Sequence, residues 1–376
     1  MTATLTAPAP AELLLAAAAR GPRRLLPLPR RLQFSYTTRF VAGEVGRSAG
    51  DYALLAGEGV VPRAGDVVVA RVAEIVNHKR VETETSRKAI LYPGALIVLA
   101  YGHRYAADQF LAHVPESLDR CHLVAAGGVA GTVTEWHAKI IGPTVIEPLG
   151  LLARGETAVN LLDDAPHVNA PVAAAPAASK SRPEVIAVLG TSMNSGKSTV
   201  MSCLVNGLSA AGRTVGAGKI TGTGAGNDRM HYHDAGANEV IDFTDFGYAT
   251  TFRQDFGSLR ALAVNMIEAL SGGNDTVLVE IADGVYQEET SRLLRDDLFQ
   301  SCVDTVVFAA VDALGARAGV QALQDAGLEV GCASGVMTSS PLAAREAEEV
   351  LGRLGVPVIG TFDLTDPAVA AGLSVR

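Results

Sequence analysis

A lysine flanked by small and hydroxyl-bearing residues directly follows an apolar run in the segment VIAVLGTSMNSGKSTV, residues 185–200. A phosphate-binding loop needs this order: a strand, a turn whose backbone N–H groups point inward, and a helix whose amino terminus carries partial positive charge. Lys197 would then reach the terminal phosphates of a nucleotide, and the hydroxyl of Ser198 would hold Mg²⁺. The glycine that usually opens such a loop is expected at Thr191, but here it is Gly190.

The flanking residues distinguish this interpretation from a plain strand-to-helix turn with a capping serine. VIAVLG is typical of a buried strand, and apolar residues recur after the loop at Val200, Leu204 and Leu208, which is the spacing of an amphipathic helix. Because strand, loop and helix occur in the required order, we expect the segment to bind a nucleotide. The candidate nucleotide-binding residues are Gly190, Thr191, Asn194, Ser195, Gly196, Lys197, Ser198 and Thr199.

A second candidate is the glutamate that ends the apolar run DTVLVE, residues 275–280. The carboxyl end of a strand beside the phosphate-loop strand is where a magnesium-binding or water-orienting acid belongs. Burying a carboxylate there without a partner would be costly, which favours a functional role over a turn cap. We therefore expect Glu280 and Ser198 to hold Mg²⁺. A further metal carboxylate is expected from Asp234 or Asp242, and the sequence does not choose between them.

The segment between these two motifs, residues 219–256, is long, polar and rich in glycine. Such a segment near a phosphate loop is typical of a substrate loop or a switch loop. Its His-Tyr-His-Asp sequence suggests a metal site, but His231 and His233 share a face only in a strand, and no third ligand has zinc-site spacing. We expect these histidines to face solvent or substrate.

The loop GTSMNSGKST resembles the phosphate loop of the dethiobiotin synthetase-like P-loop enzymes, which carry Gly-Thr at the strand end. VLVEIADG, with Glu280, is similar to their strand ending in Val-Glu, and GAGKITGTGAG, with Lys219, is similar to the segment after their second strand. The resemblance is spread over residues 185–376, about half of the chain. It implies a branch of this family with an extra N-terminal domain, in which Lys197, Lys219 and Glu280 are catalytic.

Two classes of function fit these residues. The first is an enzyme that uses Mg²⁺ and ATP to activate a small-molecule carboxylate or related oxyanion, as a ligase or kinase, with Lys197 and Lys219 stabilising the transferred phosphoryl group. The second is a nucleotide-dependent switch or carrier. A third possibility is an acyltransferase whose loop holds the phosphates of coenzyme A.

The acceptor molecule does not follow from the resemblance. Ile281 and Asp283 stand where dethiobiotin synthetase has glycines, and the first domain has no counterpart in that enzyme. The sequence has no Asn-Lys-x-Asp guanine motif, since the corresponding strand ends in GVMTSSPLA. Backbone groups from Thr338 to Pro341 would suit an adenine, so ATP is the expected nucleotide.

Composition narrows the class of protein. The chain has 376 residues, more than one core usually fills, with 48% hydrophobic and 19% charged residues, as in a globular enzyme. The net charge of −9 argues against an extended nucleic-acid surface or a polybasic membrane patch. The four scattered cysteines suit a reducing cytoplasm, and no run is long enough for a membrane span.

Two segments with few structural signals divide the chain. The Ala/Pro-rich residues 1–29 are expected to be a disordered tail, and residues 164–183 an Ala/Pro-rich linker. Residues 30–163 are expected to form a small β-rich, barrel-like or sandwich domain. Its five strand-like runs are residues 32–36, 65–76, 94–102, 122–136 and 144–152.

Residues 184–376 alternate strand and helix patterns, which predicts an α/β fold: a parallel sheet with helices on both faces. One helix is expected over residues 257–273 with Ser258 as its N-cap, and a last strand over residues 356–364.

We expect a homodimer whose first domain contributes to recognition of an acidic small-molecule substrate. Four basic residues of that domain lie in or near expected turns and would suit such a substrate, although they equally suit solvated loops. They are Lys79, Arg80, His103 and Arg104.

Overall fold

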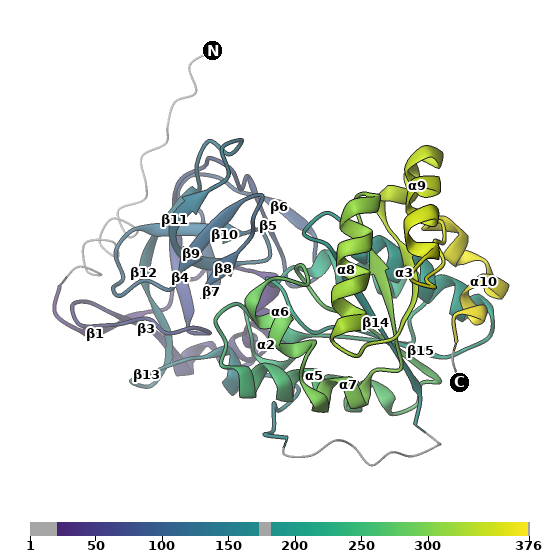
Figure 1. Cartoon of the computed structure of the whole chain (residues 1–376). Helices are drawn as coiled ribbons and strands as arrows, with labels where there is room; N and C mark the ends of the chain where they lie inside the picture. The colour runs from purple at the N-terminus through teal and green to yellow at the C-terminus, as the bar shows by residue number, and fades with distance from the viewer. Residues whose placement is uncertain (1–20, 173–181, 375–376) are drawn as a thin grey trace. The chain divides into compact units, whose positions relative to one another are not determined.

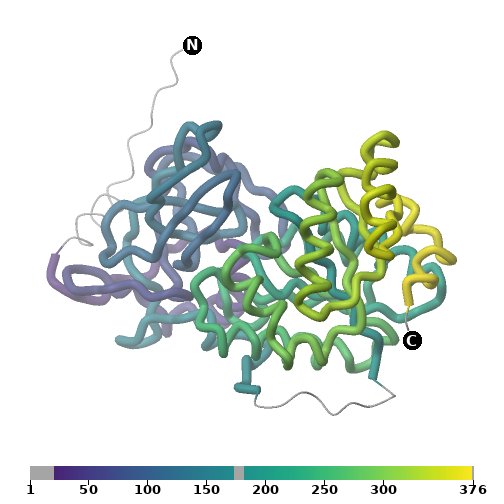
Figure 2. Tube along the Cα trace, viewed as in Figure 1, coloured from purple at the N-terminus to yellow at the C-terminus, as the bar shows by residue number. Residues whose placement is uncertain are grey.

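The chain forms two compact units. The computed structural model describes residues 21–172 and 182–374 (Figures 1 and 2). The first unit contains the described residues up to His167 together with Thr223–Gly226 and Gly247–Thr250. The second contains Val168–Gly222, Asn227–Phe246 and the described residues from Thr251 onward.

The first unit is built on a large, mostly antiparallel sheet. Its principal helix is α2 (Arg39–Arg47). Its strands are β1 (Arg24–Pro27), β2 (Gln33–Phe34), β3 (Tyr52–Ala56), β4 (Val67–Glu74), β5 (Arg80–Glu82), β6 (Lys88–Ile90), β7 (Leu96–Tyr101), β8 (Arg104–Tyr105), β9 (Phe110–His113), β10 (Cys121–Ala125), β11 (Val129–Trp136), β12 (Thr144–Arg154) and β13 (Thr157–Ala158).

Five of these strands close into a barrel. β12 pairs with β4, β4 with β7, β7 with β11, β11 with β10, and β10 returns to β12. Closure satisfies the backbone hydrogen bonds that would otherwise be exposed at two sheet edges. The β7–β11 pair is parallel and the other four are antiparallel.

Side chains on both faces of the barrel strands are buried. Along β4, Val67 lies in one core with Val41 of α2, whereas its neighbour Val68 lies in a second core with Val81 of β5. Because neighbouring residues in a strand point to opposite faces, a strand buried on both sides needs a continuous apolar run. This explains why VVVA and LIVLA lack strict alternation.

The barrel strands differ from the sequence expectation in several places. The run 122–136 is a hairpin of β10 and β11, and the run 32–36 forms only the two-residue strand β2 followed by a 3-10 turn. β1 lies inside the segment expected to be disordered. These residues are ordered because β1 pairs in register with β3. The remainder of that expected tail, residues 1–20, lies outside the described residues.

The second unit is an α/β fold with a six-stranded parallel sheet in the order β16-β15-β17-β14-β18-β19. Its strands are β14 (Glu184–Gly190), β15 (Val215–Lys219), β16 (Glu239–Asp242), β17 (Thr276–Glu280), β18 (Thr305–Ala309) and β19 (Val330–Ser334). The helices of this half of the chain are α3 (Lys197–Ala210), α4 (Gly226–Asp234), α5 (Phe256–Ser271), α6 (Glu288–Leu293), α7 (Asp297–Cys302), α8 (Ala313–Asp325), α9 (Pro341–Gly352) and α10 (Pro367–Gly372).

Helices cover both faces of this sheet, which confirms the predicted layering (Figure 1). Ile186 and Val188 of β14 share a core with Leu204 of α3. On the opposite face, α8 approaches β18 so closely that a Cβ atom added at Gly319 would overlap the ring of Phe308. Burial on both faces accounts for the apolar runs of the central strands.

Two local expectations for this unit are wrong. Residues 356–364 form no strand; Val358 makes only an isolated bridge to Ala333. Helix α5 begins at Phe256 and is capped by Asp255, whose Oδ1 accepts a hydrogen bond from the Ser258 amide at 3.0 Å. Both aspartate and serine are good N-caps, and the acid three residues earlier takes the position.

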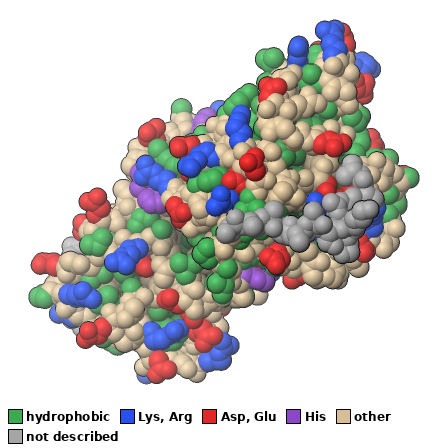
Figure 3. Space-filling model, turned by 60° about the horizontal axis from the view of Figure 1, so that its bottom comes forward, with side chains coloured by type: hydrophobic (Ala, Val, Ile, Leu, Met, Phe, Trp, Pro, Cys, Tyr) green, Lys and Arg blue, Asp and Glu red, His purple; other side chains and the backbone are tan. Residues whose placement is uncertain are grey.

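Within residues 21–172 and 182–374, no helix is both long enough and apolar enough to cross a membrane. On the face shown in Figure 3, positive and negative side chains are interspersed. All four cysteines are buried and unpaired with one another.

The close contact between α8 and β18 gives a test of the fold. Gly319→Ala should lower the free energy of unfolding by about 1–3 kcal/mol, because the added methyl group must displace the Phe308 ring. Gly352→Ala is the matched control, since nothing lies within 4 Å of a Cβ atom there, and helix propensity should make it neutral or slightly stabilising. Urea unfolding of both variants measures the difference; equal stability would contradict the packing described.

Candidate functional site

The loop between β14 and α3 has the backbone shape of a phosphate cradle. Gly196 is the N-cap of α3 with φ of +95°, and Asn194 also lies in the left-handed region with φ of +63°. A Cβ atom at Gly190 would overlap the Ser195 hydroxyl and lie 2.8 Å from the Ala309 carbonyl oxygen. Glycine is therefore required at position 190, which explains why the opening glycine of the loop stands there.

Two hydroxyl groups of this loop lack partners. Thr191 Oγ1 and Ser195 Oγ are buried and have no hydrogen-bond partner among the described residues. No side chain caps the first amides of α3. Buried polar groups in folded proteins are almost always hydrogen-bonded, and free amides at a helix start attract anions. These unsatisfied donors therefore fit an oxyanion ligand at the loop.

Lys197, the first residue of α3, is held by neutral groups. Its Nζ donates to the carbonyl oxygens of Ser192 at 2.8 Å and Asp283 at 2.9 Å. Burial lowers the pKa of Lys197, although nearby carboxylates, Glu280 first among them, oppose the shift. An ammonium group bonded to carbonyls rather than to a carboxylate can exchange them for phosphate oxygens, which bind it more strongly.

Strand register brings the other two predicted catalytic residues together. β15 and β17 pair in parallel with Lys219 opposite Glu280, and the Lys219 Nζ lies 3.1 Å from Glu280 Oε1. Lys219 also forms an ion pair with Asp228 of α4. Burial alone would lower the pKa of Lys219, but Glu280 and Asp228 outweigh it and raise the pKa above its usual value.

Helix α4 completes this network with two side chains one turn apart. Burial raises the pKa of Asp228, but Lys219 and a hydrogen bond from the Ser198 hydroxyl both lower it. Together they outweigh burial, so the pKa of Asp228 is below its usual value. The hydroxyl of Tyr232 donates to Glu280 Oε2. Burial, followed by the charge of Glu280, raises the pKa of Tyr232, so its hydroxyl stays protonated as a donor.

The two aspartates expected to offer a further metal ligand have different surroundings. Asp234 ends α4 with its side chain 80% exposed, and Asp242 caps the turn after β16, where its Oδ1 accepts from the Thr244 amide at 2.7 Å. Asp228 is the carboxylate that the fold brings to Ser198 and Glu280. The sequence signal for Asp228 was its i,i+4 spacing to Tyr232, which is visible only once the polar segment is recognised as a helix.

Both histidines of α4, His231 and His233, are exposed, as expected for residues that face solvent or substrate. His233 is 72% exposed and lies 3.6 Å from the equally exposed Asp234. In the part of the chain that the structure describes, no group of three or more His, Cys, Asp or Glu residues has the arrangement of metal ligands. Among the described residues, Ser198, Asp228 and Glu280 lie together beside the loop and offer one hydroxyl and two carboxylates that could hold Mg²⁺.

Loops from neighbouring strands enclose the phosphate loop. A Cβ atom at Gly284, after β17, would overlap the Thr191 carbonyl, and one at Gly335, after β19, would lie 2.6 Å from the Ser195 carbonyl. The Val336 amide donates to that same Ser195 oxygen at 3.1 Å. The segment expected to hold the base begins two residues later, at Thr338. Its position follows from the shared carboxyl edge of parallel strands.

The basic residues of the first unit fall into two groups. Lys79 and Arg80 are exposed; Lys79 precedes β5 and Arg80 is its first residue. Arg104 is buried and donates to Gln109 Oε1 at 3.0 Å, and His103 Nδ1 accepts from the Val114 amide at 3.3 Å. The second pair therefore forms part of the packed barrel rather than an open turn.

No protein-family model matches this chain, and no curated protein matches it. Solved structures with a similar fold include the signal recognition particle 54 kDa protein of Aeropyrum pernix K1 in complex with GDP, at 18% identity and a TM-score of 0.37. That match covers 52% of this chain and 49% of the other, so this chain spans about half the length of that protein.

Two FtsY structures are similar at the same level. The chloroplast FtsY of Physcomitrella patens is 15% identical, with a TM-score of 0.37, over 56% of this chain and 70% of that chain. The cell division protein ftsY of Thermotoga maritima is 16% identical, with a TM-score of 0.36, over 57% and 72%. Because the identities and TM-scores are this low, the ligand of this protein has to be inferred from its own residues. The second unit is an α/β fold whose parallel sheet, loop after β14 and helix α3 have the order of a P-loop fold.

The buried ion cluster yields a stability test. Lys219→Met should reduce the free energy of unfolding at neutral pH by about 3–5 kcal/mol, because Asp228 and Glu280 lose their shared cation. Without that cation, burial raises the pKa of Asp228 above its value in the unfolded chain. The folded state then binds more protons than the unfolded state, so stability falls as pH rises.

Urea unfolding at pH 5 and pH 8 checks this sign. The loss of free energy of unfolding in Lys219→Met, relative to the parent, should be larger at pH 8 than at pH 5. Arg353→Met, which breaks an exposed ion pair on α9, is the control and should show little deficit at either pH. A deficit of Lys219→Met that is independent of pH would contradict the ion cluster.

Proposed function

We propose that this protein binds Mg²⁺ and a nucleoside triphosphate, ATP in preference, and transfers the terminal phosphoryl group to a small-molecule carboxylate or related oxyanion. This is the ligase or kinase chemistry implied by the resemblance to the dethiobiotin synthetase-like enzymes. The observation that carries the proposal is the combination of two unpartnered buried hydroxyls, an uncapped helix start and a lysine held only by carbonyls in one loop.

The loop residues bind and orient the phosphates. Gly190 permits the tight turn, and the first amides of α3 with the hydroxyls of Thr191 and Ser195 donate to phosphate oxygens. Lys197 exchanges the Ser192 and Asp283 carbonyls for oxygens of the transferred group. These donors are fixed before the ligand arrives, so little reorganisation is needed as negative charge develops.

The ion cluster supplies the metal ligands and a second cation. Mg²⁺ prefers oxygen ligands, and the Ser198 hydroxyl with the Asp228 and Glu280 carboxylates provides three. Each carboxylate accepts several hydrogen bonds or ligands, so a metal ion can bind while Tyr232 keeps hold of Glu280. The metal supplies charge neutralisation when bound. Lys219, raised in pKa, stays protonated and stabilises the oxyanion of the acceptor.

A nucleotide-dependent switch is the second candidate. One short helix, α4, carries both Asp228, the partner of Lys219, and Tyr232, the partner of Glu280. The helix begins at Gly226, the last residue of Thr223–Gly226, a segment that belongs to the first unit. A change in the contacts of Lys219 that moves α4 would therefore also move a chain segment outside the nucleotide fold. ADP release that depends on a small molecule favours the enzyme, and slow hydrolysis stimulated by a protein partner favours the switch.

Lys197→Ala tests the phosphate contact. We expect the affinity for Mg–ATP to fall at least about tenfold, because one charge-assisted contact to phosphate is lost, while the fold is retained. Calorimetric titration of ATP, GTP and acetyl-coenzyme A into the parent also ranks the ligands. Arg345→Ala, an exposed change on α9, serves as the control. Unchanged ATP affinity in a folded Lys197→Ala variant would remove the phosphate-loop proposal.

Glu280→Gln tests the metal role separately. The substitution keeps the size and a hydrogen-bond acceptor but removes the charge that helps hold a divalent cation. We expect turnover to fall by at least about tenfold and the Mg²⁺ requirement to rise, with metal-free nucleotide binding less affected. Glu268→Gln, on the exposed side of α5, is the matched control. A Mg²⁺ titration that gives the same curve for Glu280→Gln and the parent would rule out the metal role.

A further inference from the structure

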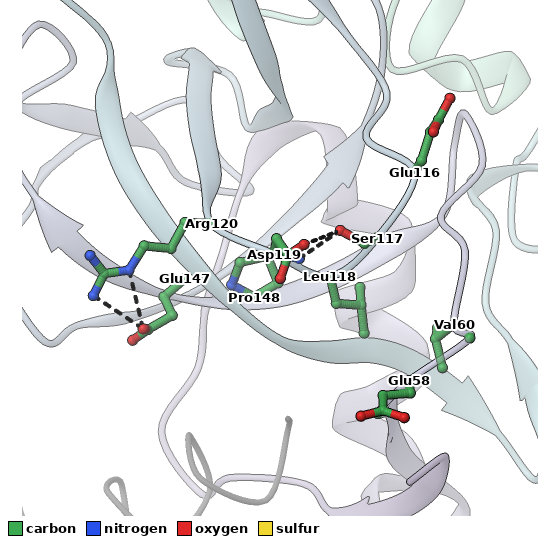
Figure 4. A pocket seen from close by; sticks show the side chains of 11 residues that line it. Glu58, Val60, Glu116, Ser117, Leu118, Asp119, Arg120, Glu147 and Pro148 are labelled. Atoms are coloured by element: carbon green, nitrogen blue, oxygen red, sulfur yellow. Dashed lines mark hydrogen bonds and ion pairs between the residues drawn. The ribbon is translucent and has the colours of Figure 1, made fainter. Parts of the chain in front are cut away.

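The first unit contains an open cavity of about 730 Å³ that the phosphate loop does not share (Figure 4). Three segments line it: the turn Gly57–Val60 after β3, the segment Glu116–Arg120 before β10, and Glu147–Pro148 of β12. A cavity of this volume is in the range of small-molecule sites. All of its lining residues belong to the first unit, so it is formed without any residue of the nucleotide fold.

One end of the cavity lies beside a group of three charged side chains with surplus positive charge, of which Arg120 and Glu147 line the cavity and Arg71 lies behind Glu147. Glu147 is largely buried and pairs with two guanidinium groups, those of Arg71 and Arg120. Burial raises the pKa of Glu147, but the arginines outweigh it and lower the net pKa, so the carboxylate is ionised. Two cations facing one anion leave one positive charge without compensation.

Arg120 is the arginine that is available to a ligand. Its Nε and one terminal nitrogen both approach Glu147 Oε1 at 3.3 Å, which is longer than the usual 2.7–2.9 Å of a charge-assisted bond. Its side chain is 62% exposed, whereas that of Arg71 is 21% exposed. A planar guanidinium with free donors at the mouth of a cavity suits a carboxylate.

Elsewhere the lining carries surplus negative charge. Figure 4 shows Glu58 and Glu116 well away from Arg120 across the cavity. Within the described ranges, neither carboxylate forms an ion pair with an arginine, lysine or histidine. Asp119 is tied to the Ser117 hydroxyl at 2.7 Å and adds a third negative charge. This part of the lining favours a cation.

Apolar side chains make up the rest of the lining. They are Val60, Leu118 and Pro148. A ligand that spans the cavity therefore meets an anion-binding group, an apolar stretch and cation-binding groups. A polyphosphate would be repelled by the three acids, and a simple amine would leave the surplus charge at Arg120 unmet.

We propose that this cavity binds a small zwitterion of the amino-acid class. Its carboxylate is bound by Arg120, its ammonium group faces the acidic side of the cavity, which Glu58 and Glu116 line at separate points, and its methylene groups lie on the apolar lining. The proposal goes beyond the nucleotide chemistry and does not depend on it, because binding at this cavity requires no nucleotide.

Calorimetric titration of the full chain without nucleotide tests the proposal. The probes are glycine, 4-aminobutyrate and 6-aminohexanoate, with hexanoate and hexylamine as analogues that lack one charged group. We expect at least one zwitterion to bind with a Kd below about 10 mM and each one-charge analogue to bind at least about tenfold more weakly.

Variants assign the binding to this cavity. Arg120→Met and the double change Glu58→Gln with Glu116→Gln should each weaken zwitterion binding at least about tenfold. Arg47→Met, which removes an exposed arginine of α2 in the same unit, should leave binding unchanged. The proposal is overturned if no zwitterion binds below about 10 mM, if hexylamine or hexanoate binds equally well, or if Arg120→Met binds like the parent.

Discussion

A lysine buried between two carboxylates is the interaction on which the second unit depends. Placing Lys219, Asp228 and Glu280 away from water is tolerable only because each charge is paired and hydrogen-bonded. The parallel register of β15 and β17 fixes Lys219 opposite Glu280, and helix α4 supplies Asp228 and the Tyr232 hydroxyl. Loss of any one partner leaves the others uncompensated, so strand register and α4 stabilise one another.

The same cluster supplies charged groups for the proposed chemistry. The phosphate loop offers Lys197 and unpartnered hydroxyls, while the cluster beside it offers a second ammonium and two carboxylates. Lys197 and Lys219 balance Asp228 and Glu280, so these four side chains carry no net charge without ligand. A phosphate group with its Mg²⁺ can enter such a site by exchange of partners. The groups that stabilise the fold are then also the groups that bind the ligand.

Local patterns predicted the nucleotide fold well. The apolar run before Gly190, the spacing of α3 and the carboxylate ending β17 are features of short sequence windows, and the structure places them together because parallel strands share a carboxyl edge. Asp228 was missed because α4 is short and polar and has no apolar periodicity. The hydrogen bond of Asp242 to the Thr244 amide could not be predicted, because a turn-capping carboxylate and a metal carboxylate look the same in sequence.

The barrel depends on contacts that no local pattern contains. Its closure needs β10 to pair with both β11 and β12 and β7 to pair with β11, and the apolar strands show no preference for one neighbour. The charges of the cavity are equally non-local: Arg71 and Glu147 are 76 positions apart. Such convergences follow from topology, which strand patterns alone do not determine.

The proposed nucleotide site can be tested by a crystal structure of the full chain grown with Mg²⁺ and a non-hydrolysable ATP analogue. We expect the β- and γ-phosphates in the loop 190–199, with the Lys197 Nζ at about 3 Å from a phosphate oxygen. We also expect the Ser192 and Asp283 carbonyls to lose their bonds to Lys197. Density for the analogue elsewhere, or a loop in which Lys197 keeps both carbonyl bonds at saturating analogue, would contradict this proposal.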